Sequence, residues 1–235
     1  MSHPDSLTPA VVAGLEQQSA GRRRLLDEGA QHLGWKAGFG TPAAMEKLGT
    51  RAPLIGFMTD RNLLADGATC AIGDWGKPVL EPEVAVRLGS DLAPGGDRDA
   101  ALAAVDAVAT AIELIDLDGP ADDVDAILAG NIFHRHVVLG AFAPLSADLR
   151  LDAVALDVVQ GTDDVRAQAA DPATLLGDLA EVVRHLADQA PNAGDQLRAG
   201  DVIITGSAIA GVPISPGERF EVRAGGLAPV SVRLT

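Results

Sequence analysis

The sequence has little cysteine and no long run of uncharged apolar residues. Its single cysteine, Cys70, excludes an internal disulfide, and no cluster of cysteines and histidines indicates a zinc site. We expect Cys70 to be a small buried residue. No apolar run reaches the ~18 residues of a membrane span, and residues 1–5 lack the basic start and apolar core of a signal peptide. We therefore expect a cytoplasmic protein.

Positive charge is also scarce. Lysine and arginine number 18 against 33 aspartates and glutamates, which gives a formal net charge of −15 at pH 7. Such a polyanion does not attract nucleic acids or anionic membrane surfaces, so we exclude both as partners. A small anionic substrate would need a local positive centre in this protein.

Apolar residues, in contrast, are plentiful. With 47% hydrophobic residues among 235, the chain can fill one sizeable core. The sequence contains no internal repeat, low-complexity tract or linker. Many short predicted strands and a few helices favour an α+β fold whose centre is a curved or barrel-like β-roll with covering helices.

Local signals predict where the elements lie. Residues suited to helix N-caps are Thr8, Thr41, Asp97 and Asp171, and we predict that helices begin after them and that the first extends to Gly34. Strands are predicted at 35–40, 53–58, 76–89, 109–116, 137–139, 201–205, 220–223 and 230–233, with two more within 149–159 and a short helix at 122–128.

Two carboxylates stand two residues apart inside the apolar stretch 76–89. Successive side chains of a strand alternate between its faces, so Glu81 and Glu83 point the same way. Two like charges that face one point repel unless a cation neutralises them or one is protonated. Oxygen donors suit Mg2+ or Mn2+ rather than zinc. A solvated edge strand, which Pro82 would tolerate, explains the pattern equally well.

A third carboxylate lies in the predicted strand 109–116. Glu113 stands in the middle of an interior apolar strand, where an unpaired carboxylate costs several kcal/mol. We therefore interpret Glu113 as the third ligand of the same metal ion.

Lysine is the rarer cation, since only Lys36, Lys47 and Lys77 are lysines. Lys36 stands beside apolar residues and glycines, where a lysine can exchange a proton as an acid or base and an arginine cannot. A lysine whose stem packs while its head reaches water remains the alternative. Asp60, at the end of the strand 53–58, is either a turn residue or a carboxylate of the site.

A polar cluster lies between two hydrophobic segments. It contains Asn131, His134, Arg135 and His136, and we interpret it as a candidate pocket wall. The two histidines alternate as metal ligands sometimes do. No third soft ligand accompanies them, so we favour hydrogen bonding or substrate contact over zinc.

A glycine turn follows the predicted strand 201–205. Gly206 frees backbone N–H groups and Ser207 adds a hydroxyl donor. Such a turn can bind a carboxylate. It can equally be a tight hairpin corner.

The order of these motifs resembles that of the 2-keto-4-pentenoate hydratase family, in the hydratase and decarboxylase branch of the fumarylacetoacetase superfamily. Residues 34–38 (GWKAG) resemble its Gly-x-Lys-x-Gly motif, 81–85 (EPEVA) its Glu-x-Glu strand, and 200–207 (GDVIITGS) its closing motif. Glu113 matches its third metal ligand. The resemblance covers most of the chain.

The resemblance implies a fold of the fumarylacetoacetase C-terminal-domain type. Because the sequence shows no repeat or linker, we expect one N-terminal helical arm at 1–34 and one catalytic β-roll domain at 35–235. It implies that Glu81, Glu83 and Glu113 bind Mg2+ or Mn2+. The activity implied is hydration of a 2-hydroxy-2,4-dienoate to a 4-hydroxy-2-oxo acid, in the catabolism of aromatic meta-cleavage products.

The resemblance also implies roles for single residues. Lys36 would move protons, and Asp60 would tune it or orient water. Ser207 and neighbouring backbone N–H groups, among them that of Gly206, would bind the substrate carboxylate. Because the family forms oligomers, a homo-oligomer is expected.

The sequence departs from the family after Asn131, where the residues are bulkier and more basic than usual. We hypothesise that His134 or Arg135 accommodates a larger or more highly charged substrate. Alternatives are therefore a 2-oxo-3-enedioate (4-oxalocrotonate-type) decarboxylase and a catalytically silent metal-binding partner subunit. A C–C bond hydrolase is disfavoured, because His32 has no evident carboxylate partner in the sequence.

Overall fold

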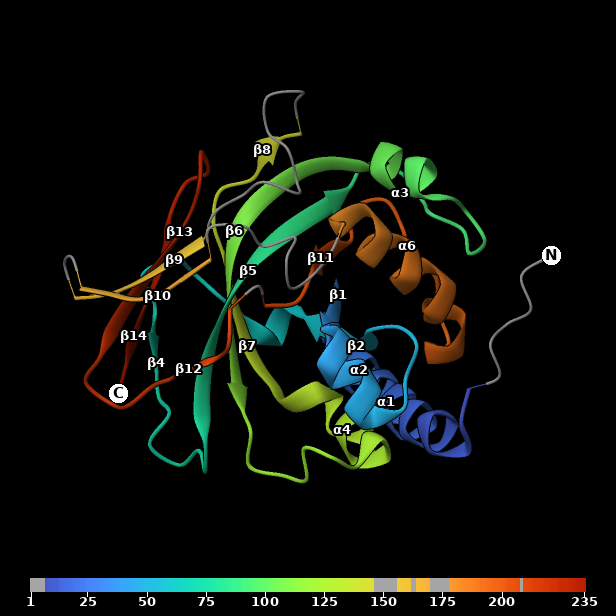
Figure 1. Ribbon diagram of the computed structural model, residues 1–235, viewed down its shortest axis with the longest axis horizontal. Coiled ribbons are helices and arrows are strands. Elements are labelled where there is room, and N and C mark those ends of the chain that lie inside the picture. The colour runs from blue at the N-terminus through green and yellow to red at the C-terminus, as the bar shows by residue number, and fades with distance from the viewer. Residues whose placement is uncertain (1–6, 146–155, 162–163, 170–177, 208) are drawn as a thin grey trace.

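The fold is built on one large curved sheet and one smaller sheet (Figure 1). The computed structural model describes residues 7–145, 156–161, 164–169, 178–207 and 209–235. Nine strands form the larger sheet in the order β2-β1-β11-β5-β6-β7-β3, with β12 beside β5 and β8 beside β6. Their bounds are β1 His32–Gly38, β2 Leu54–Thr59, β3 Leu63–Leu64, β5 Pro78–Leu88, β6 Val105–Asp116, β7 His134–Leu139, β8 Ala143–Pro144, β11 Val202–Ile204 and β12 Val212–Pro213.

The smaller sheet has five strands in the order β10-β9-β13-β14-β4. They are β4 Thr69–Cys70, β9 Leu156–Gln160, β10 Asp164–Ala169, β13 Arg219–Ala224 and β14 Val230–Leu234. The helices α1, α2, α4 and α6 lie on one side of the curved β5–β6 pair, and the smaller sheet lies on the other (Figure 1). This confirms the predicted α+β fold with a curved sheet and covering helices.

Helix starts follow their capping residues. The helices are α1 Pro9–Asp27, α2 Pro42–Leu48, α3 Arg98–Ala104, α4 Val124–Ala129 and α6 Leu179–Gln189, with 3-10 turns η1 Asp60–Asn62, η2 Asn131–Phe133 and η3 Ala190–Ala193. The side chains of Thr8, Thr41 and Asp97 accept hydrogen bonds from the first turns of α1, α2 and α3, as predicted. Asp171 lies outside the described residues, and α6 is capped by Asp178.

Helix α1 is shorter than predicted and packs against the body of the protein. It ends at Asp27 rather than Gly34, because Gly29 turns the chain at a φ of 90° and β1 begins at His32. The buried side chain of Gln18 donates hydrogen bonds to the carbonyls of Ile55 and Leu128, at 3.1 and 3.0 Å. The division into an arm and a domain stays a prediction, but the helix itself is joined to the sheet by buried contacts.

The two long antiparallel strands β5 and β6 form the middle of the large sheet. Their register places Glu81 opposite Glu113. On the other edge of β5, β11 pairs antiparallel with it, and β1 pairs parallel with β11 so that Lys36 faces Ile204 in register. This order brings residues from both ends of the chain next to Glu83. Cys70 is buried, as predicted, and none of the described helices is long and apolar enough to span a membrane.

Candidate metal centre and active site

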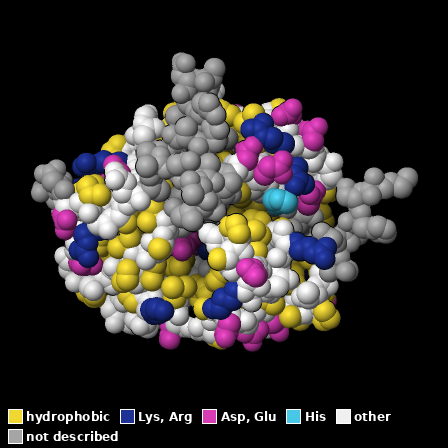
Figure 2. Space-filling view, in the orientation of Figure 1, with side chains coloured by type: hydrophobic (Ala, Val, Ile, Leu, Met, Phe, Trp, Pro, Cys, Tyr) yellow, Lys and Arg dark blue, Asp and Glu magenta, His cyan; other side chains and the backbone are white. Residues whose placement is uncertain are grey.

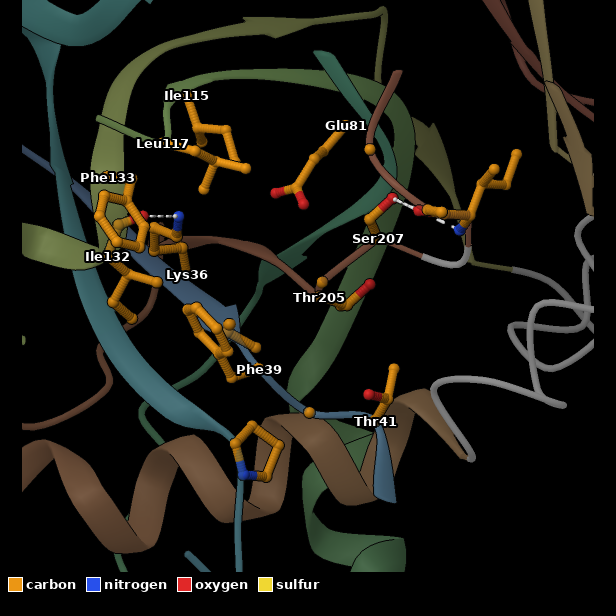
Figure 3. Close-up of a pocket in the computed structure, with 18 of the residues that line it drawn as sticks. Lys36, Phe39, Thr41, Glu81, Ile115, Leu117, Ile132, Phe133, Thr205 and Ser207 are labelled. Carbon is orange, nitrogen blue, oxygen red and sulfur yellow. Dashed lines mark hydrogen bonds between the residues drawn. The ribbon is translucent and has the colours of Figure 1, made fainter. Parts of the chain in front are cut away.

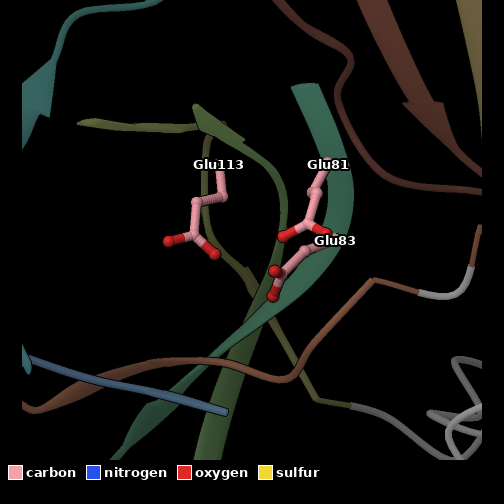
Figure 4. Close-up of side chains that lie close together, drawn as sticks. All are labelled: Glu81, Glu83 and Glu113. Atoms are coloured by element: carbon pink, nitrogen blue, oxygen red, sulfur yellow. The ribbon is translucent and has the colours of Figure 1, made fainter. Parts of the chain in front are cut away.

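Three glutamates from β5 and β6 meet at one point (Figure 4). One carboxylate oxygen from each of Glu81, Glu83 and Glu113 lies within 4.8 Å of the others. The side chains of Glu83 and Glu113 are fully buried. The alternative of a solvated edge strand is therefore wrong. Pro82 is tolerated inside the sheet because it falls between the segment of β5 that pairs with β12 and the segment that pairs with β11.

The hydrogen bonds of these carboxylates leave two buried oxygens without a partner. Glu113 Oε1 accepts hydrogen bonds from Lys36 Nζ and from His134 Nδ1, the latter at 2.6 Å. Glu83 Oε2 accepts one from the backbone N–H of Gly206 at 2.7 Å. Glu83 Oε1 and Glu113 Oε2 are buried and have no hydrogen-bond partner among the described residues. Unpaired buried carboxylate oxygens are stabilised by a proton or a cation, and an all-oxygen donor set fits Mg2+ or Mn2+.

The environment separates the pKa values of the three carboxyl groups. Burial, together with the negative charge of Glu113, raises the pKa of Glu81 to about 7. Burial and the charges of Glu113 and Glu81 raise the pKa of Glu83 well above its usual range. Burial also acts to raise the pKa of Glu113, but the charge of Lys36 and the hydrogen bond from His134 outweigh it, so this pKa is lowered. Lys36 thus favours the ionised form of Glu113, while burial and like charges disfavour ionisation of Glu81 and Glu83, a cost that a bound cation would offset.

Lys36 is buried beside this cluster. Its side chain is 1% exposed, so the alternative of a lysine head that reaches water is wrong. Nζ donates to Glu113 Oε1 and to the carbonyl of Ile132 at 3.2 Å. An ammonium has three N–H donors. With these two bonds made, one N–H remains for the cavity that Lys36 lines.

A cavity of about 440 Å3 opens beside Glu81 and Lys36, which both line it (Figure 3). Its polar lining includes Lys36, Glu81, Thr41, Thr205 and Ser207. Its apolar lining includes Phe39, Pro53, Ile115, Leu117, Ala121, Ile132, Phe133, Val182, Ile209 and Ala210. Figure 2 shows hydrophobic side chains gathered around a hollow in the middle of the face seen there.

An unusual backbone turn forms one wall of this cavity. Asn131, Ile132 and Phe133 all have left-handed conformations, with φ angles of 51°, 54° and 61°. Such a conformation is strained for a β-branched residue such as Ile132. The turn directs the carbonyl of Ile132 toward Lys36 and places the ring of Phe133 in the cavity wall. The strained backbone of Ile132 therefore supplies the carbonyl that accepts a hydrogen bond from Lys36.

Several predicted substrate contacts have other partners. The side-chain amide of Asn131 bonds the backbone N–H and carbonyl of Phe57, both at 2.9 Å, and so holds β2. Arg135 pairs with Asp116 at 3.2 Å. His134 lies behind Glu113 with a fully buried side chain. These three residues are not among the residues that line the cavity.

Asp60 is also away from the cavity. It is exposed, and its Oδ1 accepts a hydrogen bond from the backbone N–H of Gln31 at 2.8 Å. Lys36 lies opposite Gly56 in register, four residues before Asp60, a distance of about 13 Å along a strand. The turn interpretation of Asp60 therefore fits, and the interpretation in which it tunes Lys36 does not. Glu113, supported by His134, is the carboxylate that contacts Lys36 instead of Asp60.

The two residues of the glycine turn after β11, Gly206 and Ser207, have different contacts. The Gly206 N–H donates to Glu83, so it positions a carboxylate of the protein instead of a substrate carboxylate. Ser207 lines the cavity, and its hydroxyl lies 2.7 Å from the carbonyl of Ile209 and 3.2 Å from that of Pro82. The hydroxyl has one proton to donate, so Ser207 can contact a substrate carboxylate only by turning this hydroxyl away from the carbonyls.

The sequence did not lead us to the apolar residues that line the cavity. Ile115 and Leu117 follow Glu113 at steps of two, so the strand alternation that was applied to Glu81 and Glu83 was sufficient to find them. Phe39 and Phe133 have ring centroids 6.4 Å apart, and both have positive φ angles. No sequence pattern predicts such angles for phenylalanine, so the positions of these rings could not be predicted. His32 also has a carboxylate neighbour, since its Nε2 lies 3.4 Å from Asp201 Oδ1.

A curved mixed sheet that buries three converging carboxylates beside a lysine defines a protein with a divalent-metal centre. Residues 34–235 match the model of the family described as "Fumarylacetoacetate (FAA) hydrolase C-terminal", and the chain belongs to this family. The resemblance noted in the sequence is thereby confirmed.

Two activities, decarboxylase and hydratase, occur among the relatives about 30% identical to this chain. The chain is 31% identical to a 4-oxalocrotonate decarboxylase of Pseudomonas sp. (strain CF600), covering 90% of this chain and 81% of the relative. It is 32% identical to 2-keto-4-pentenoate hydratase 2 of Dechloromonas aromatica (strain RCB), covering 91% and 82%. The structure of 4-oxalocrotonate decarboxylase from Pseudomonas putida G7 complexed with magnesium and adipate has a TM-score of 0.87 and 28% identity over 94% of this chain and 85% of that one.

Proposed function

We propose that this protein is a divalent-metal-dependent hydratase that adds water to a 2-hydroxy-2,4-dienoate and yields a 4-hydroxy-2-oxo acid. The observation that carries the proposal is the pair of unpartnered buried oxygens, Glu83 Oε1 and Glu113 Oε2, in a cluster with Glu81 and Lys36, two residues that line a cavity. A structural carboxylate cluster would not need a lysine donor directed at a cavity.

Each residue of the site has a task in this reaction. Glu81, Glu83 and Glu113 hold Mg2+ or Mn2+, which supplies Lewis acidity toward the oxygens of the substrate. Lys36 carries a proton at Nζ and exchanges it with the substrate through the N–H that is not bound to the protein. Ser207 turns its hydroxyl from the backbone carbonyls of Ile209 and Pro82 to donate to the substrate carboxylate.

A decarboxylase that acts on a 2-oxo-3-enedioate is the second candidate. It is favoured by a relative with that activity and by the structure of a decarboxylase with bound adipate. A catalytically silent partner subunit is less well supported, because such a subunit has no need of Lys36. The proposal includes a cytoplasmic homo-oligomer in the catabolism of aromatic meta-cleavage products, with a helical arm at 1–34 and a catalytic domain at 35–235.

The experiment is to mix the protein with Mg2+ and 2-hydroxypenta-2,4-dienoate, follow the loss of dienol ultraviolet absorbance, and identify the product by mass. The proposal predicts a gain of one water that Glu83→Gln abolishes and Glu16→Gln, a change at an exposed glutamate of α1, leaves intact. Absence of turnover with metal bound, or loss of CO2 from a longer diacid, would refute the hydratase.

A further inference from the structure

The side chain of Lys36 passes close to a glycine of the neighbouring strand. In the antiparallel pairing of β1 with β2, Lys36 lies opposite Gly56. A Cβ atom built on Gly56 would lie 2.7 Å from Cγ and 3.0 Å from Cδ of Lys36, and 3.0 Å from Oδ1 of Asn131. Carbon atoms in contact are about 3.5–4.0 Å apart, so an alanine at this position would overlap the stem of the lysine.

The backbone of β2 gives no other reason for a glycine at position 56. Gly56 does not have a positive φ angle, and it lies inside a strand whose residues are all buried. A glycine inside a strand loses more conformational entropy on folding than an alanine does, and it contributes no side chain to the packing. The space beside Gly56, which the stem of Lys36 occupies, is therefore the feature that requires a glycine.

Lys36 cannot readily leave this space, because its side chain is held at both ends. Its backbone is paired on one side with β2 and on the other with β11. At the other end, Nζ donates to Glu113 Oε1 and, at 3.2 Å, to the carbonyl of Ile132 (Figure 3). A displacement of Cγ would therefore break one of these hydrogen bonds or redirect the N–H that remains for the cavity.

Strand β2 is held as well. The side-chain amide of Asn131 bonds the backbone N–H and carbonyl of Phe57, the residue after Gly56. Asn131 also begins the left-handed turn that supplies the carbonyl of Ile132 to Lys36. A methyl group added to Gly56 would thus have to be accommodated by Lys36, or else by a shift of β2 that breaks the bonds of Asn131.

We propose that Gly56 is a positioning residue of the active site: because it lacks a side chain, it reserves the space for the stem of Lys36 and so fixes the point in the cavity that Nζ reaches. This rests on the proposed function for the role of Lys36 in proton exchange. Gly56 is not among the described residues that line the cavity, so it acts on the substrate only through Lys36.

The first test compares the hydration of 2-hydroxypenta-2,4-dienoate by Gly56→Ala and by the wild type, with Mg2+ present. We expect kcat to fall about 100-fold, because a misplacement of about 1 Å can have this effect, and KM to stay within about threefold, because the cavity lining is unchanged. Gly73→Ala adds a methyl group with no atom within 4 Å of it and should keep both constants. A wild-type kcat in Gly56→Ala, or a rise in KM alone, would overturn the proposal.

The second test is a double-mutant cycle of stability, which needs no substrate. Gly56→Ala should lower the urea midpoint of unfolding in the wild-type background, and at least about half of this loss should disappear in the Lys36→Ala background. The physical reason is that truncation of the lysine vacates the space that the new methyl group needs. Equal losses in both backgrounds would mean that the methyl group meets the strand itself, which would overturn the proposal.

The two tests also separate this inference from the function on which it rests. Coupling between Gly56 and Lys36 in stability, in a protein that hydrates no dienoate, would refute the hydratase and leave the placement of Lys36 standing. Hydration by the wild type with an unchanged kcat in Gly56→Ala would refute the positioning role and leave the hydratase standing.

Discussion

At the scale of single residues, the centre depends on how Glu113 divides its two oxygens. Oε1 accepts from both Lys36 and His134, and Oε2 is left without a partner among the described residues. A carboxylate accepts hydrogen bonds only, so His134 must carry its proton on Nδ1. His134 therefore fixes the rotation of a carboxylate that a metal would bind, although it touches neither the cavity nor the cation site directly.

The first prediction concerns this hydrogen bond. His134→Leu removes the donor, and we expect it to lower Mg2+ affinity by about 10- to 100-fold, as loss of such supporting contacts typically does. His134→Asn places an amide N–H close to the position of Nδ1 and should retain most of the affinity. Calorimetric titration of both variants measures the difference. Equal affinities in the two variants would show that His134 only fills space.

The sequence indicated the three clustered glutamates but not the residues that support them. Glu81 and Glu83 were predictable because strand alternation is a local property, and Glu113 because a buried carboxylate needs a partner. Asp60 was misplaced because its partner, the backbone of Gln31, is set by the pairing of β1 with β2. The hydrogen bond from Gly206 to Glu83 could not be predicted either, because these residues are 123 positions apart and only strand pairing brings them together.

At the scale of elements, strand β1 carries Lys36 between β2 and β11. Gly34 makes the parallel pairing with β11 possible, since a Cβ atom there would lie 1.8 Å from the carbonyl oxygen of Val202. Backbone atoms cannot move away as a flexible side chain can. The close approach of these strands is therefore a condition for the position of Lys36.

The second prediction follows from this contact. Gly34→Ala should destabilise the protein by more than about 3 kcal/mol, because the methyl group forces β1 away from β11. Gly21→Ala, inside α1, adds a methyl group with no atom within 4 Å of it and should stabilise the protein by about 0.5–1 kcal/mol through helix propensity. Urea unfolding measures both. A Gly34→Ala protein as stable as the wild type would mean that the strands tolerate separation.

Element boundaries were predictable where a cap set them. Thr41 and Asp97 begin α2 and α3 as expected because a cap bonds to its own first turn. The order of the strands was not predictable from patterns, since β1 and β11 come from opposite ends of the chain and a local window cannot see their pairing. The left-handed turn at Ile132 is likewise held by Lys36 and by the packing of its own side chain against Gly38.

At the scale of the whole molecule, an acidic protein that buries a carboxylate cluster should become less stable as those groups ionise. The pKa of Glu81 is raised from 4.5 to about 7 by burial, and that of Glu83 is raised as well. Through these two groups the folded protein binds more protons than the unfolded chain above pH 4.5, so their contribution to stability falls as pH rises toward 7. Burial lowers the pKa values of His134, His136 and His185 from 6.5, and these groups act in the opposite sense within the same range. Glu113, Asp116 and Asp195, whose pKa values are lowered, act in the opposite sense below their ordinary values of 4.5 and 3.8.

The third prediction is the pH profile of the metal-free protein. In urea unfolding with EDTA, Glu81 should contribute a loss of stability of about 3 kcal/mol at most between pH 4.5 and about 7. Glu81→Gln should remove this contribution, so the variant should lose less stability than the wild type over the range, and Mg2+ should offset the loss in the wild type because it binds only the folded state. Identical pH profiles of the wild type and Glu81→Gln in EDTA would mean that Glu81 is not packed against the other carboxylates in solution.

The central claim is that Glu81, Glu83 and Glu113 bind one divalent cation, and its most direct test is titration of the EDTA-treated protein with Mn2+, followed by the electron paramagnetic resonance signal of free Mn2+. We predict a single bound Mn2+ per chain that Glu83→Gln and Glu113→Gln each lose and that Glu16→Gln keeps. Binding of Mn2+ with unchanged affinity in both glutamate variants would contradict the account.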